Sequence, residues 1–77
     1  MDIKEIQKIL TERLLDLMSE KEIKNAYALS KVLHIPNRTI YSWLNGEKVP
    51  RIDYVIKLAK FFNVPTDYLL GVKDEPW

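Results

Sequence analysis

The chain has 77 residues, of which 47% are hydrophobic and 30% are charged, and this is the size of one small domain with a single core. It has no cysteine and a single histidine, so we expect neither catalysis nor a bound metal or cofactor. No apolar run reaches the roughly 18 residues of a membrane span, and the first residues are charged rather than typical of a secretion signal, which predicts a cytoplasmic protein.

The net charge of +1 conceals an uneven distribution along the chain. Residues 1–22 carry four basic and six acidic side chains, and their charges sum to −2. Residues 23–60 carry seven basic and two acidic side chains and sum to +5, whereas residues 61–77 sum to −2. A basic middle between acidic ends is typical of a surface for a polyanion, although chance also produces blocks of this size.

The chain begins with an amphipathic helix, predicted between Ile3 and Met18 from apolar residues at steps of three and four. Its apolar stripe is formed by Ile3, Ile6, Leu10, Leu14 and Leu17, with Ile9, Leu15 and Met18 beside them. A short second helix is predicted over residues 25–33, because Asn25 is a good N-cap residue and four apolar residues follow at helical spacing. These four are Ala26, Leu29, Val32 and Leu33.

A third helix is predicted over about residues 36–44. Pro36 suits the first turn of a helix, and Ile35 before it is disfavoured in the α conformation, so the second helix has to end before this pair. The dipeptide Asn45-Gly46 is a strong turn signal and ends the third helix. The apolar face of this helix, which we expect in the core, consists of Ile35, Ile40 and Trp43.

A fourth helix is predicted over residues 52–62, with a start near Arg51 and a buried stripe at helical spacing. This stripe consists of Ile52, Val55, Ile56, Ala59 and Phe62, flanked by Leu58 and Phe61. Residues 66–71 predict a short fifth helix that ends at Gly71, and residues 72–77 predict a loosely ordered tail or the start of a linker. No segment alternates with a period of two, so the sequence predicts an all-α fold in which five helices over residues 1–71 share one compact core.

The third helix also carries polar side chains along the face opposite its apolar residues. At 100° per residue, five of them fall within about 140° of the helix circumference. These five are Asn37, Arg38, Tyr41, Ser42 and Asn45. Such a stripe can meet base edges in the major groove of DNA. On the second helix, the small Ser30 allows two backbones to approach where helices cross over a short turn.

Several short motifs combine into a specific pattern over about residues 6–71. They are Ala26-Tyr27-Ala28-Leu29-Ser30, Leu33, Ile35, Thr39-Ile40-Tyr41-Ser42-Trp43-Leu44-Asn45-Gly46, Pro50, Leu58-Ala59-Lys60 and Asp67-Tyr68-Leu69-Leu70-Gly71. This pattern resembles the lambda-repressor-like helix-turn-helix family, which includes phage repressors, Cro proteins and Xre-type bacterial regulators. The resemblance implies a helix-turn-helix at the second and third helices.

The resemblance also implies the partner and the contacts. The partner is double-stranded DNA with a palindromic or pseudo-palindromic operator, and a homodimer binds it. The third helix is then the recognition helix, with base-reading residues at Asn37, Arg38 and Ser42, and we add Tyr41 from the same outward stripe. Phosphate contacts are expected at Thr39, Asn45, Lys48 and Arg51. We expect the dimer surface at the fifth helix and the tail, at Tyr68, Leu69, Val72 and Trp77.

Three positions depart from the family pattern. Ala26 stands where family members often have a glutamine that contacts phosphate. His34 stands in the turn where glycine is usual, and histidine is among the few other residue types enriched in the left-handed conformation. Pro36 stands where a serine often caps the third helix, and it offers no capping oxygen. We expect Thr39 to compensate for this in part.

The leading interpretation is therefore a sequence-specific transcriptional regulator, a repressor of phage or bacterial type. The alternative is a protein-interaction module of the same fold, such as an antitoxin-like or antirepressor-like partner whose third helix faces protein. Asn37 and Arg38 favour DNA, because a protein-facing helix should carry a larger apolar patch than Tyr41 alone provides. Tyr54 and Trp77 are expected to be exposed or to face a partner.

Overall fold

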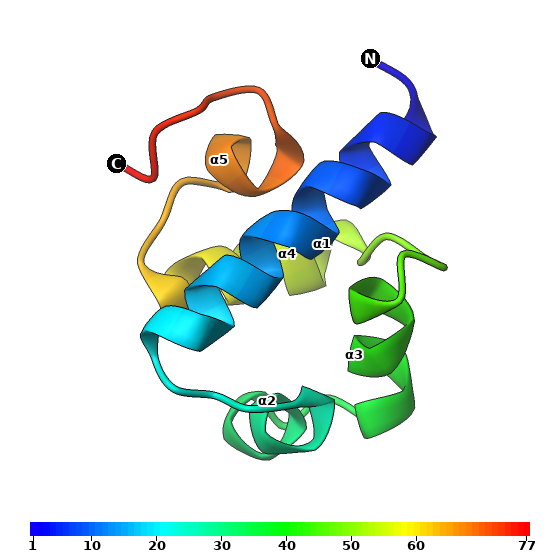
Figure 1. The fold of residues 1–77 in the computed structure, drawn as a ribbon, viewed down its shortest axis with the longest axis vertical. Helices are drawn as coiled ribbons and strands as arrows, with labels where there is room; N and C mark the ends of the chain where they lie inside the picture. The colour runs from blue at the N-terminus through cyan, green and yellow to red at the C-terminus, as the bar shows by residue number, and fades with distance from the viewer.

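The computed structural model describes all 77 residues, and they form five α-helices without any strand. These are α1 (Ile3–Glu20), α2 (Ala26–Leu33), α3 (Asn37–Leu44), α4 (Ile52–Phe62) and α5 (Thr66–Leu70). In Figure 1, α1 crosses the middle of the molecule, with α2 and α3 to one side and α5 with the C-terminal tail to the other. The all-α prediction of five helices is confirmed. No helix combines the length and the apolar character needed to cross a lipid bilayer.

One cluster of 14 buried apolar residues forms the core, and every helix contributes to it. The cluster consists of Leu10, Leu14, Leu17, Met18, Leu29, Leu33, Ile35, Ile40, Trp43, Val55, Leu58, Ala59, Phe62 and Leu69. The predicted face of the third helix is confirmed, because Ile35, Ile40 and Trp43 are all buried. These side chains come from the residues just before α3 and from both of its turns, so α3 is fixed to the core along its whole length.

The predicted stripe of α4 is wrong at two positions. Ile52 is 79% exposed and Ile56 is also exposed, whereas Leu58, expected only to flank the stripe, is fully buried. The observed stripe of Val55, Leu58, Ala59 and Phe62 has helical spacing as well. Periodicity alone could not choose between the two faces, because apolar residues occupy most positions of this helix. Ile3, Leu15 and Val32, which the predicted stripes of the first two helices included, are exposed as well.

Gly71, which follows the last residue of α5, is favoured there both by its backbone conformation and by the packing of α5 on α1. Gly71 ends α5 with φ 85°, a left-handed conformation that side chains disfavour. A Cβ atom built on Gly71 would lie 2.7 Å from Cδ1 of Ile9 on α1, which is shorter than any normal contact. The sequence predicted the glycine stop, and the structure adds the close approach of the two helices.

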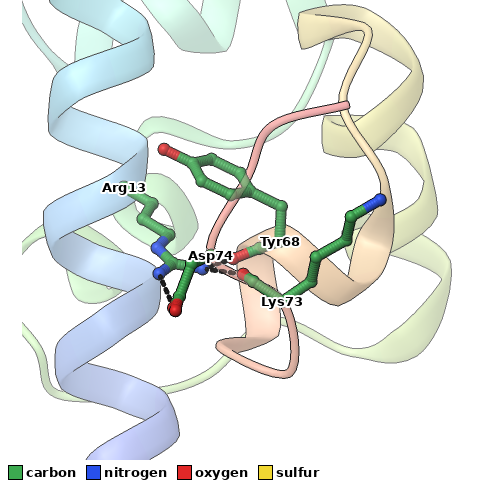
Figure 2. A network of polar contacts seen from close by, with 4 residues as sticks. All are labelled: Arg13, Tyr68, Lys73 and Asp74. Atoms are coloured by element: carbon green, nitrogen blue, oxygen red, sulfur yellow. Dashed lines mark hydrogen bonds and ion pairs between the residues drawn. The ribbon is translucent and has the colours of Figure 1, made fainter.

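The first residues of the tail after α5 contact Arg13 of α1, which the expectation of a loosely ordered end did not include. The Arg13 side chain is only 18% exposed, and its Nη1 donates to the carbonyl oxygens of Tyr68 and, at 2.7 Å, of Lys73 (Figure 2). Its guanidinium carbon lies 4.3 Å from the centre of the Tyr68 ring, and Nη2 forms an ion pair with Asp74 at 3.4 Å. Arg13 therefore ties α1 to one carbonyl within α5 and to one carbonyl in the tail that follows it.

Arg13→Ala is expected to destabilise the domain by about 1–2 kcal/mol, because two carbonyl oxygens lose a charged donor in a half-buried place. Asp74→Asn is the matched control, and it should change the free energy of unfolding by less than about 1 kcal/mol because the Arg13–Asp74 pair is exposed on the Asp74 side. Urea unfolding of both variants measures the difference. Equal losses from both variants would contradict the assigned role of the carbonyl contacts.

Candidate nucleic-acid interface

The joint between α2 and α3 is built from local hydrogen bonds that the sequence dictates. Asn25 caps α2, and its side chain accepts from the N–H of Ala28 at 2.9 Å. α2 ends at His34, which adopts the left-handed conformation with φ 57° and ψ 42°. The N–H groups of His34 and Ile35 both donate to the carbonyl of Ser30, a closed C-terminal turn of the kind that glycine usually makes. Histidine therefore occupies the turn as the sequence predicted.

α3 begins without a side-chain cap. Pro36 precedes it in an extended conformation, and its carbonyl accepts from the N–H groups of Thr39 and Ile40 at 3.0 and 3.2 Å. The expectation that Thr39 partly replaces a capping residue is wrong, because no side chain caps this helix. Pro36 stabilises the start through its fixed φ alone.

The two faces of α3 differ sharply in exposure. Ile40 and Trp43 are buried, whereas Asn37, Arg38 and Tyr41 are exposed on the other side. In Figure 1, α3 lies at the edge of the molecule, on the side away from α5. The structure thus brings three of the four predicted base-reading residues together on one open surface.

Two further predicted contacts are less accessible. Ser42 is half-buried, and its hydroxyl donates to the carbonyl of Thr39 at 2.6 Å. The hydroxyl proton of Ser42 is therefore used inside the helix, while its oxygen can still accept a hydrogen bond. Thr39 is also half-buried and lies at the border between the two faces of α3.

The back of α3 is fixed by two residues that sequence reasoning did not assign to the site. Thr11 of α1 donates from its hydroxyl to the Trp43 carbonyl at 2.6 Å. Tyr54 of α4 places its ring 5.6 Å from the Trp43 ring, at an angle of 55°. Tyr54 was expected to be exposed or to face a partner, but it is half-buried against the core. In the sequence, the only feature that connected Tyr54 to the candidate site was its position, three residues after Arg51.

The loop after α3 carries the predicted phosphate contacts Asn45, Lys48 and Arg51, and all three side chains are exposed. Asn45 donates from Nδ2 to Oε1 of Glu47 at 3.1 Å. Arg51 donates twice to Asp53, from Nε at 3.2 Å and from Nη2 at 3.0 Å. Lys48 forms neither an ion pair nor a side-chain hydrogen bond, and the same is true of Arg38 on α3.

The paired charges at the start of α4 also shift their protonation equilibria. The hydrogen bond and the charge of Asp53 raise the pKa of Arg51 above its usual value. Conversely, the hydrogen bond from Arg51 lowers the pKa of Asp53. Both side chains therefore remain charged at neutral pH.

We compared the chain with models of known protein families. A family model described as helix-turn-helix matches residues 20–69, which is more than half of the chain. The chain belongs to the helix-turn-helix family. This result confirms the resemblance to Cro and Xre-type proteins, and the matched residues include all of α2, α3 and α4. This helix-turn-helix protein is thus a DNA-binding regulator in general terms. Neither the curated proteins nor the solved structures gave a match.

Proposed function

We propose that this helix-turn-helix protein is a sequence-specific repressor of phage or bacterial type, which places α3 in the major groove of an operator. The observation that carries the proposal is the exposed surface of Asn37, Arg38 and Tyr41 on a helix whose opposite face is buried. Arg38 has no acidic partner, so its guanidinium is free to donate to a ligand. An arginine in this position can donate to O6 and N7 of guanine, and an asparagine can pair with adenine.

Phosphate contacts fix the register of such a complex. We propose Thr39, Asn45, Lys48 and Arg51 for this role, since they lie beside α3 or in the loop that follows it. Tyr41 and Ser42 complete the base-reading surface, Ser42 through its remaining acceptor. Bound in the bacterial cytoplasm, the protein represses by occupying the operator and excluding polymerase, which requires neither chemistry nor a cofactor.

The proposal is tested by selecting binding sites from random duplex and titrating the selected site at several salt concentrations. We expect a recurrent motif, and an association constant whose logarithm falls linearly with the logarithm of salt concentration. Retention of a protein partner together with no enrichment of any duplex would instead favour the protein-interaction module.

We propose that two copies bind the operator together, because one recognition helix reads about one half-site. The expected dimer surface has to be corrected at Leu69, which is fully buried and cannot contact a second copy. Val72 and Trp77 remain exposed, and Tyr68 is half-buried. Close by, an apolar groove of about 260 Å³ is lined by Ile3, Ile6, Leu10, Val49, Pro50, Ile52, Val55 and Leu70.

A second copy is the occupant that we propose for this groove. Ile3 and Ile52 expose apolar surface at the rim of the groove. In a two-fold dimer the same patch of both copies is in contact, so projecting side chains of one copy can enter the groove of the other. Leu70, one of the residues that line the groove, lies two positions before the exposed Val72 of the expected surface. Its lining residues Val49 and Pro50 directly precede Arg51, so a contact there lies next to the proposed phosphate contacts.

Ile52→Asp is expected to weaken binding to the full operator by tenfold or more, since a charge would enter an apolar contact. Binding to an isolated half-site should fall by a clearly smaller factor, from the added charge beside Arg51 alone, because Ile52 is 79% exposed and its replacement leaves the fold intact. Ile56→Asp is the control on the same helix, outside the groove. Equal effects of both substitutions on the operator would argue against this dimer surface.

A further inference from the structure

The basic middle of the chain, residues 23–60, contains two acidic residues, Glu47 and Asp53. Each follows a proposed phosphate contact by two positions and accepts hydrogen bonds from it. Glu47 binds the amide of Asn45, and Asp53 binds the guanidinium of Arg51 through two bonds. Of the seven basic residues in the same segment, only Arg51 forms an ion pair with an acidic side chain. The two acids are therefore placed on the DNA-contacting donors rather than scattered over the surface.

The Arg51 side chain is held in one orientation by these contacts. Its guanidinium carbon lies 4.6 Å from the centre of the Tyr54 ring while Nε and Nη2 face Asp53. The guanidinium has five N–H donors, so the pair with Asp53 leaves Nη1 and one proton of Nη2 unused. A phosphate can reach Arg51 only by using these remaining donors or by displacing Asp53.

We propose that Glu47 and Asp53 are specificity-determining residues that make the phosphate contacts of Asn45 and Arg51 conditional on correct register of α3. This inference rests on the proposed function. In a complex with unrelated sequence, where base contacts do not fix α3, the donors stay on the two acids. In the operator complex, base contacts hold the backbone phosphates at a fixed place, and the donors transfer to them.

The strengths of the competing contacts allow such a switch. An exposed ion pair is worth at most about fivefold in an equilibrium constant, so a well-placed phosphate can outcompete it. Non-specific binding depends almost wholly on phosphate contacts, and each contact withheld weakens it. Because the regulator has to find one site among many competing ones, lower non-specific affinity raises the specificity ratio.

The test uses Glu47→Ala, Asp53→Ala and the double variant, titrated against the selected operator and a random-sequence duplex of equal length. We expect Asp53→Ala to bind the random duplex about two- to fivefold more tightly than the wild type. Its salt slope on that duplex should steepen by about 0.9, the value of one added phosphate contact. Operator affinity should rise by a smaller factor, so the specificity ratio falls. Glu47→Ala should act in the same direction with a smaller effect, because the Asn45 amide carries no charge.

Asp16→Ala is the matched control, since it removes one exposed acid on α1 that forms no ion pair. The same gain from Asp16→Ala would show a general charge effect and overturn the inference. It is also overturned if Asp53→Ala changes both duplexes by one factor, or weakens both, as a purely orienting role of Asp53 predicts. Absence of wild-type binding to any duplex would instead refute the proposed function, and the inference with it. Melting curves of each variant confirm that the titrations compare folded proteins.

Discussion

Replacing Trp43 with alanine is expected to abolish DNA binding by unfolding the domain. The Trp43 side chain is 2% exposed within the core cluster, and its ring lies against Tyr54. Truncation of a buried tryptophan costs about 3–5 kcal/mol. A small domain has a free energy of unfolding near the lower end of about 5–15 kcal/mol, so this loss removes most of its stability. Circular dichroism during thermal unfolding measures the effect.

Trp77→Ala provides the control for Trp43→Ala. Trp77 is 78% exposed, so its truncation should change the free energy of unfolding by no more than about 0.5 kcal/mol. The comparison separates loss of the fold from loss of an indole ring. A Trp43→Ala protein that melts like the wild type but does not bind DNA would show that Trp43 contacts DNA directly.

The sequence was sufficient to predict α3 and its buried face because the two faces of this helix differ in chemistry. Ile35, Ile40 and Trp43 are separated from polar residues by helical periodicity, and turn residues mark both ends of the segment. The left-handed turn at His34 followed from the family resemblance, because the pattern has a glycine there and histidine is among the few other residue types that adopt this conformation. α4 lacks such a contrast. Both of its possible apolar faces have the right spacing, and only packing against the other helices leaves Ile52 outside.

Contacts between distant parts of the chain could not be predicted from sequence pattern. Arg13 donates to carbonyl oxygens 55 and 60 residues away. Every residue has a backbone carbonyl, so the residue types do not show which carbonyl will accept the hydrogen bond. The contacts that Arg13 makes with Lys73 and Asp74 of the tail were missed for this reason. Leu69 is buried because α5 packs on α1. The sequence of so short a helix did not show which of its faces would make this contact. The pairs at Asn45 and Arg51 depend on the backbone of the loop and of the first turn of α4, so they also required the structure.

Arg38→Ala is expected to lower operator affinity by about 1–3 kcal/mol and to relax the preference at one base pair in each half-site. The reason is that Arg38 is exposed on the outward face of α3, free of any acid, where its guanidinium can donate twice to guanine. Lys48 is equally exposed and unpaired, but it lies in the loop after α3, where a phosphate strand would run. We therefore expect Lys48→Ala to weaken all duplexes alike.

The two variants differ most clearly in how their binding depends on sequence and salt. Each is titrated against the selected operator and its single-base variants at several salt concentrations. Lys48→Ala should make the salt slope shallower by about 0.9 and leave the ranking of sites unchanged, because it removes one phosphate contact and no base contact. Arg38→Ala should change the ranking at one position, since the guanine there loses its only bidentate donor. An unchanged ranking with Arg38→Ala, combined with an altered ranking with Lys48→Ala, would transfer base reading from α3 to the loop that follows it.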